Sequence, residues 1–199
     1  MKEVYISKDV RLSPHFTLDE LCKTSYHTLD GNIPSHVAIE NLKRICENWL
    51  EDLRFSYNEL YGEGVKGNGR EVKGKFLRPC GSKRSKIERK GQYSEIPIII
   101  SSGYRSEEVN RKCGGAKGSN HLTGCAVDIK CYGPEQMIRM AGILLDIADG
   151  TKRDFDELIL EKRGSTYWVH FAVRPKDRST TKGDACQSKN RRKILFDCK

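Results

Sequence analysis

The 199-residue sequence contains no run of about 20 apolar residues, the length that a helix needs to cross a bilayer. Its first residues, MKEVYISKDVRLSPHF, also lack the apolar stretch of a secretory signal. We therefore expect a protein with no membrane span that is synthesised in the cytoplasm. The hydrophobic content of 37% is somewhat low, but it is enough for one folded domain with its own core.

Motifs that would indicate several common functions are also missing. The eight cysteines include no CxxC pair, which argues against a zinc ribbon or a thioredoxin-like site. Without a secretory signal, these cysteines are expected to be free thiols in a reducing compartment. The sequence has no helix-turn-helix pattern, aromatic stacking run or zinc-finger spacing, so a nucleic-acid-binding function would rest on charge alone. We expect no specific nucleic-acid partner.

The net charge of +9 is concentrated in two segments. Residues 62–92 hold ten lysines and arginines against three glutamates, and residues 173–199 hold nine against three aspartates, so the rest of the chain is mildly acidic. This distribution predicts a domain over residues 1–173 with a basic loop inserted at 62–92, followed by a basic C-terminal tail at 174–199. Such segments would bind an anionic cell wall, nucleic acid or an acidic partner surface by electrostatic attraction.

Apolar periodicity and capping residues predict an alternation of helices and short strands. Helices are expected at 17–23, 35–58, 106–111 and 134–150, and strands at 96–102, 125–129, 158–161 and 168–173. The last two strands are close enough in sequence to form a hairpin. This order predicts an α+β fold in which helices flank a central, mainly antiparallel sheet.

The candidate chemical site begins in the segment GSNHLTGCAVD, where His121 and Asp128 lie seven residues apart. A glycine turn and small residues separate them, so the two side chains can converge where a loop runs back into a strand. His170 lies within an apolar strand and is the third candidate. Three nitrogen and oxygen ligands leave a fourth zinc position for water, which a hydrolytic site requires. The pattern predicts one Zn²⁺ ion held by His121, Asp128 and His170.

At these residues the sequence resembles the zinc D-Ala-D-Ala carboxypeptidase family, which includes VanX-type dipeptidases and phage L-alanyl-D-glutamate endolysin peptidases. The SxHxxGxAxD motif of the family is matched at Ser119, His121, Gly124, Ala126 and Asp128. The segment SGYR at residues 102–105 and the sequence WVH at residues 168–170 are also similar to the family. The similarity spans about residues 14–173 and is interrupted by 62–92.

The resemblance implies the fold of the hedgehog-like metallopeptidases, one zinc ion and substrates that are peptides of bacterial peptidoglycan. It implies that Arg105 binds acidic groups of the substrate and that Ser119 and Trp168 face the substrate. A planar guanidinium suits a carboxylate through bidentate pairing. The simpler alternatives are that Arg105 forms a salt bridge at the start of a helix and that Ser119 braces its loop.

The catalytic base is the part of the family pattern that this chain does not reproduce. Several relatives have an acidic residue three positions before the last zinc ligand, where this chain has Tyr167. If the strands of the predicted hairpin pair across a six-residue loop, Glu161 opposes Trp168 and lies diagonally beside His170. Glu161 is therefore the candidate base, which would deprotonate the attacking water and later protonate the leaving amine. Glu157 shares its face and is the reserve, and a slip of one residue would exclude both.

These observations favour a zinc metallopeptidase that hydrolyses peptidoglycan stem peptides, as a D,D-carboxypeptidase or as an endopeptidase at L-Ala-D-Glu or D-Ala bonds. A phage lysin fits this expectation, because it would act on the cell wall after release or as part of a virion without a signal of its own. The alternative is a non-catalytic cell-wall-binding or virion structural protein that retains the peptidase fold.

Overall fold

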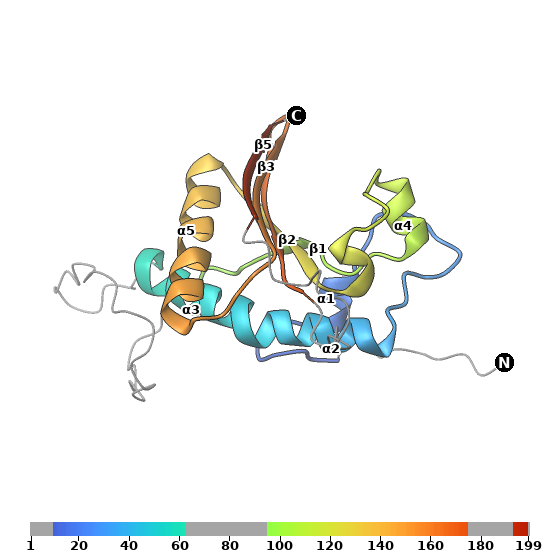
Figure 1. The fold of residues 1–199 in the computed structure, drawn as a ribbon, viewed down its shortest axis with the longest axis horizontal. Coiled ribbons are helices and arrows are strands. Elements are labelled where there is room, and N and C mark those ends of the chain that lie inside the picture. The colour runs from blue at the N-terminus through green and yellow to red at the C-terminus, as the bar shows by residue number, and fades with distance from the viewer. Residues whose placement is uncertain (1–9, 63–94, 175–192, 199) are drawn as a thin grey trace, which may run out of the picture.

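The computed structural model describes residues 10–62, 95–174 and 193–198 (Figure 1). Its helices are α1 (Leu18–Cys22), α2 (His36–Ile45), a π-helical turn (Cys46–Leu50), α3 (Glu51–Tyr61), α4 (Glu107–Lys112), a 3₁₀ turn (Asn120–Thr123) and α5 (Pro134–Thr151). Its strands are β1 (Ile100–Ser102), β2 (Ala126–Cys131), β3 (Glu157–Arg163), β4 (Thr166–Ala172) and β5 (Lys193–Cys198). Nearly all of the predicted insertion at 62–92 lies outside the described residues.

The five strands form one mixed sheet in the order β1-β2-β4-β3-β5. The pairs β1–β2, β2–β4 and β3–β4 are antiparallel, and only β5 runs parallel to its neighbour β3. Helix α5 packs against β2, β3 and β4, and α3 packs against α5 (Figure 1). The predicted α+β fold with a mainly antiparallel sheet and flanking helices is confirmed.

Hydroxyl side chains begin three of the helices at the predicted places. Thr17, Ser35 and Ser106 each accept a hydrogen bond from a backbone N–H in the first turn that follows. The predicted helix over 35–58 is observed as one helical segment over residues 36–61, in which the π-helical turn joins α2 directly to α3. No helix in the described parts of the chain is both long and apolar enough to cross a membrane.

The hairpin of β3 and β4 has the predicted register. Glu161 opposes Trp168 and Ile159 opposes His170. The strands extend further than expected, so only two residues connect them, and Gly164 adopts a φ of +58° in that turn. The face on which each side chain of this hairpin lies could therefore be deduced from the sequence.

The strand expected at 96–102 is wrong over its first half, because regular strand structure begins only at Ile100. Pro97 has no N–H to contribute to a ladder. The amide side chain of Asn58 in α3 binds the backbone of Ile96 on both sides, accepting from its N–H at 2.6 Å and donating to its carbonyl at 2.9 Å. This segment is therefore held by α3 before the chain enters the sheet.

The basic tail predicted at 174–199 also differs from the structure at its end. Residues 193–198 form β5, which pairs with β3 from Glu157 to Lys162. The pattern KILFDC is too short to identify as a strand within a basic segment, because its pairing with β3 depends on contacts distant in sequence. The sheet therefore includes the C-terminal residues rather than ending at residue 173.

The core between the long helical segment and the sheet is built around aromatic rings. Trp49, in the π-helical turn, is 3% exposed and packs with its ring centroid 4.8 Å from that of Phe171 and 6.4 Å from that of Phe155. Both phenylalanines are 1% exposed or less. This cluster fixes the helices against β4, the strand that carries His170.

We expect Trp49→Ala to lower the free energy of unfolding by about 3–5 kcal/mol, because it removes a buried aromatic side chain and leaves a cavity. The matched control is Ile138→Ala in α5, since this side chain is 56% exposed and its loss should change stability by less than about 0.5 kcal/mol. Urea unfolding followed by circular dichroism measures both. Equal stability losses for the two variants would contradict the described packing.

Candidate metal centre and active site

Two residues of the SxHxxGxAxD motif shape the turn before β2 that carries His121. The hydroxyl of Ser119 accepts a hydrogen bond from the backbone N–H of His121 at 3.3 Å and caps the 3₁₀ turn. Gly124 ends the turn with a φ of +69°, and a Cβ there would lie 2.4 Å from the carbonyl oxygen of Ala38. A glycine is thus required for both its backbone conformation and the close approach to α2.

The imidazole of His121 is oriented by a backbone carbonyl. Its Nδ1 lies 2.6 Å from the carbonyl oxygen of Gly103, to which it donates, so Nε2 carries the free lone pair. Gly103 packs so tightly that a Cβ would lie 2.2 Å from the carbonyl oxygen of Leu21. The glycine of the SGYR segment therefore allows the backbone contact that sets the tautomer of the histidine.

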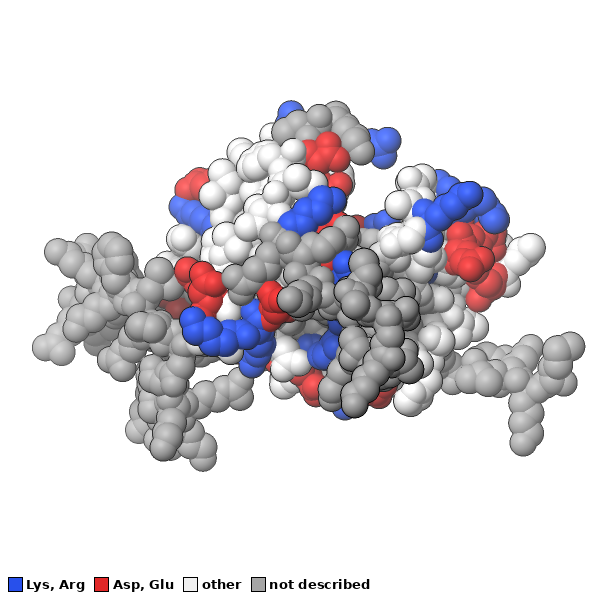
Figure 2. Space-filling model, in the orientation of Figure 1, with Lys and Arg blue, Asp and Glu red and all other residues white. Residues whose placement is uncertain are grey.

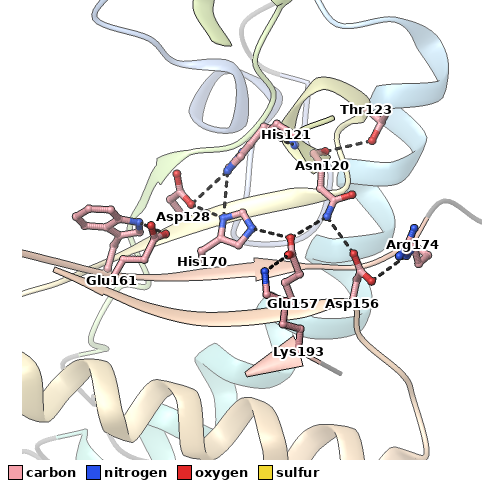
Figure 3. A network of polar contacts seen from close by, with 12 residues as sticks. Asn120, His121, Thr123, Asp128, Asp156, Glu157, Glu161, His170, Arg174 and Lys193 are labelled. Atoms are coloured by element: carbon pink, nitrogen blue, oxygen red, sulfur yellow. Dashed lines mark hydrogen bonds and ion pairs between the residues drawn. The ribbon is translucent and has the colours of Figure 1, made fainter. Parts of the chain in front are cut away.

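The structure brings His121, Asp128 and His170 together around one point (Figure 3). Asp128 in β2 and His170 in β4 are directly paired across the two strands. The Oδ1 atom of Asp128 lies 2.9 Å from Nδ1 of His170 and 3.2 Å from Nε2 of His121, and the two nitrogens are 3.3 Å apart. His121 and Asp128 are buried, and the His170 side chain is 12% exposed.

The spacing of these three atoms tests whether zinc would fit. Ligand atoms bound about 2.0 Å from a tetrahedral zinc ion lie about 3.3 Å from one another. The observed separations of 2.9, 3.2 and 3.3 Å agree with this value. Two imidazole nitrogens and one carboxylate oxygen also match the donor types of a hydrolytic zinc site, which leaves a fourth position open. The residues fit the ion, and their role as ligands remains a prediction.

The charges of the three groups are strongly coupled. Burial raises the pKa of Asp128, but the charges and hydrogen bonds of His121 and His170 outweigh this effect and hold its pKa well below the usual range. Burial lowers the pKa of His121. Burial also lowers the pKa of His170, but the hydrogen bond to Asp128 and the nearby carboxylate of Glu157 outweigh it and raise that pKa to about 9. A metal ion binds the deprotonated imidazole, so a bound cation would replace the proton between His170 and Asp128.

Arg105 lies beside the metal cluster, in contact with a candidate ligand. Its Nη2 donates to Oδ2 of Asp128, and its Nε donates to the hydroxyl of Ser102 at 2.8 Å. The side chain is 18% exposed and borders a cleft that is also lined by Lys23 and Tyr26. The structure thus contains a salt bridge between Arg105 and Asp128, as the simpler alternative for Arg105 expected. The contact between Arg105 and a substrate carboxylate remains a prediction. Ser119 likewise has the observed role of a cap.

Glu161 and Trp168 lie on the same sheet face as His170, as the hairpin register requires. The indole Nε1 of Trp168 donates to Oε2 of Glu161 at 2.8 Å, which fixes the carboxylate at the edge of the cluster (Figure 3). Burial raises the pKa of Glu161, and the negative charge of Asp128 raises it further. A half-buried carboxylate with a raised pKa is a better proton acceptor near neutral pH. The roles of Glu161 as base and Trp168 as substrate contact stay predictions.

Tyr167, at the position where relatives carry an acidic residue, faces the other side of the sheet. Its ring packs against the hydrophobic core, beside strand neighbours such as Val169, and Lys162 lies over the ring. An acidic side chain at 167 would therefore point toward the helices in this register and could not reach the metal cluster. Tyr167 and Glu161 therefore lie on opposite faces of the sheet, and Glu161 shares its face with His170.

A group of polar residues beside His170 was not identified as functional from the sequence, apart from the reserve role of Glu157. Asn120 donates to the carboxylates of Asp156 and Glu157 at 3.1 Å each. Arg174 donates to Asp156 at 2.8 Å, and Lys193 of β5 lies 3.3 Å from Glu157. The one available sequence signal was that Glu157 shares strand parity with Glu161.

The excess positive charge of the chain lies mainly in residues 62–92 and 175–192, which are almost entirely outside the described residues. On the face drawn in Figure 2, basic and acidic side chains are interspersed over the described surface. The described residues on this face therefore form no continuous basic patch.

The model of the Peptidase M15 family matches residues 73–152. This match confirms the predicted resemblance over these residues. The match includes His121 and Asp128 and ends before His170, which the β2–β4 pairing places directly opposite Asp128. The matched region also begins within the basic segment 62–92. A search of curated proteins finds no match to the chain. M15 peptidases are zinc-dependent hydrolases.

We expect Gly124→Ala to destabilise the protein by about 1–3 kcal/mol, because alanine disfavours the positive φ and its Cβ would meet the carbonyl of Ala38. Displacement of the turn should also weaken zinc binding by His121. The matched control is Gly118→Ala in the same loop, where a Cβ meets nothing within 4 Å. Urea unfolding and zinc titration distinguish the two, and a Gly124→Ala protein as stable as Gly118→Ala would contradict the described turn.

Proposed function

We propose that this protein is a zinc peptidase that hydrolyses stem peptides of bacterial peptidoglycan. The observation that supports this proposal most directly is the His121, Asp128 and His170 cluster, whose three ligand atoms have the mutual spacing of zinc ligands. The M15 match covers two of these residues.

We propose that Glu161 transfers the proton of the attacking water during hydrolysis. When bound, zinc supplies a Lewis acid that polarises a carbonyl and makes water more acidic. Glu161 would accept the proton of the attacking water at a carboxylate oxygen and deliver it to the nitrogen of the leaving amine. The hydrogen bond from Trp168 holds the Glu161 carboxylate on the face of the sheet that carries His170.

The cleft beside Arg105 is the proposed location of the acidic part of the substrate. Lys23 and Arg105 supply positive charge, and Ser102, Tyr26 and Tyr104 supply hydroxyl groups. Stem peptides carry free carboxylates, which such a lining would bind by charge-assisted hydrogen bonds. The cleft is compatible with D,D-carboxypeptidase action and with endopeptidase action at L-Ala-D-Glu or D-Ala bonds.

The basic segments 62–92 and 173–199 would add affinity for an anionic cell wall. This role, synthesis in the cytoplasm, and action on the wall after release or within a virion all belong to the same proposal, in which the protein serves as a phage lysin.

The test is mass spectrometry of purified peptidoglycan digested by the full zinc-loaded chain. We expect the wild type to release stem-peptide fragments, His121→Ala to release none, and Glu161→Gln to be about 10²–10⁴-fold slower while still binding zinc. Glu135→Gln is the matched control, since Glu135 lies on the exposed surface of α5 and should leave the rate unchanged. Removing zinc with a chelator should stop cleavage, and adding it back should restore cleavage.

Two outcomes would contradict the proposal. A wild-type chain that binds zinc but releases no fragment from peptidoglycan would support the alternative of a non-catalytic wall-binding or virion protein. A Glu161→Gln variant with the wild-type rate would show that another group acts as the base.

A further inference from the structure

The carboxylate of Glu157 lies on the outer side of His170, away from the other candidate ligands (Figure 3). His170 points its Nδ1 atom at Asp128 and His121, and its Nε2 atom lies 3.7 Å from Oε2 of Glu157. The Glu157 side chain is 13% exposed. The two nitrogens of the ring therefore face two different carboxylates, and Glu157 is the one outside the cluster.

Asn120 connects this carboxylate to the turn that carries the other histidine. It directly precedes His121, and its Nδ2 donates to Oε2 of Glu157 and to Oδ2 of Asp156 at 3.1 Å each. Asp156 is completely buried and also accepts from Arg174 at 2.8 Å. One amide group thus uses two hydrogen bonds to hold two adjacent acidic residues at the start of β3.

The C-terminal strand reaches the same carboxylate. Lys193 is the partner of Glu157 in the β3–β5 ladder, and its Nζ lies 3.3 Å from Oε1 of Glu157. The lysine side chain is 40% exposed, so solvent weakens this ion pair. The contact nevertheless holds one carboxylate oxygen toward β5 while the other faces Asn120 and His170.

We propose that Glu157 is a positioning residue for the metal centre: its carboxylate orients the imidazole of His170 so that Nδ1 faces the ion, and Asn120 aligns that carboxylate with the His121 turn. This inference rests on the metal centre of the proposed function. A carboxylate on the second nitrogen fixes the tautomer and the ring plane of a metal-bound histidine and increases its basicity. Glu157 lies outside the three candidate ligand atoms and would act through His170.

The test measures the zinc affinity of the full chain by competition with a chromophoric chelator. We expect Glu157→Ala to weaken zinc binding by roughly 10–100-fold, the range typical for loss of a group that orients a ligand. Glu157→Gln retains an oxygen that can accept from both Asn120 and His170, so it should recover part of that loss. Lys193→Met should have a smaller effect, and Glu135→Gln on the surface of α5 should have none.

The unfolding of each metal-free variant is measured alongside. If Glu157→Ala binds zinc as tightly as the wild type, the positioning role is wrong. It is also wrong if the weaker binding is matched by an equal loss in Glu157→Gln and by partial unfolding of the metal-free protein, since a purely structural role would give that result. A wild-type chain that binds no zinc would instead contradict the metal centre and the proposed function.

Discussion

The antiparallel pairing of β2 with β4 places Asp128 directly opposite His170, and the proposed site depends on this register. Side chains alternate between the two faces of a sheet, so a slip of one residue would turn one partner toward the helices. The apolar residues on either side of Asp128 and His170 in their strands prevent such a slip. Val127, Ile129, Val169 and Phe171 are completely buried on the opposite face, where α5 and the Trp49 cluster cover the sheet. The hydrophobic core therefore fixes the position of two candidate ligands.

The buried charge of Asp128 imposes the second constraint on the site. A carboxylate in this position is costly unless each oxygen has a partner. Arg105 takes Oδ2, and the two histidines converge on Oδ1. Because the arginine occupies one oxygen, the other is directed toward the point where the imidazoles meet. The salt bridge of Arg105 thus gives the aspartate a defined orientation, which a mononuclear zinc site needs.

Local patterns in the sequence predicted much of this arrangement. The motif residues His121 and Asp128 are in one segment. The pairing assumed across residues 162–167 predicted that Glu161, Trp168 and His170 share a face, and the observed register agrees with it. Serine and threonine caps marked the helix starts because their hydrogen bonds are made within three residues.

The remaining features depend on contacts between residues distant in sequence. Asn58 holds Ile96 and delays the start of β1, and β5 joins the sheet only because β3 has a free edge. Asn120 reaches Glu157 across 37 positions of sequence. No periodicity or motif reports such contacts, so the polar group around Glu157 became visible only in the folded chain.

The proposed site holds a single ion through two histidines and one aspartate, although the chain has eight cysteines that could compete for zinc. X-ray absorption spectroscopy at the zinc edge of the loaded full chain tests this ligand set. We expect one zinc ion per chain with a shell of nitrogen and oxygen atoms at about 2.0 Å, the multiple-scattering pattern of two imidazoles, and no sulfur. A sulfur shell at about 2.3 Å, or a spectrum unchanged by His170→Ala, would contradict it.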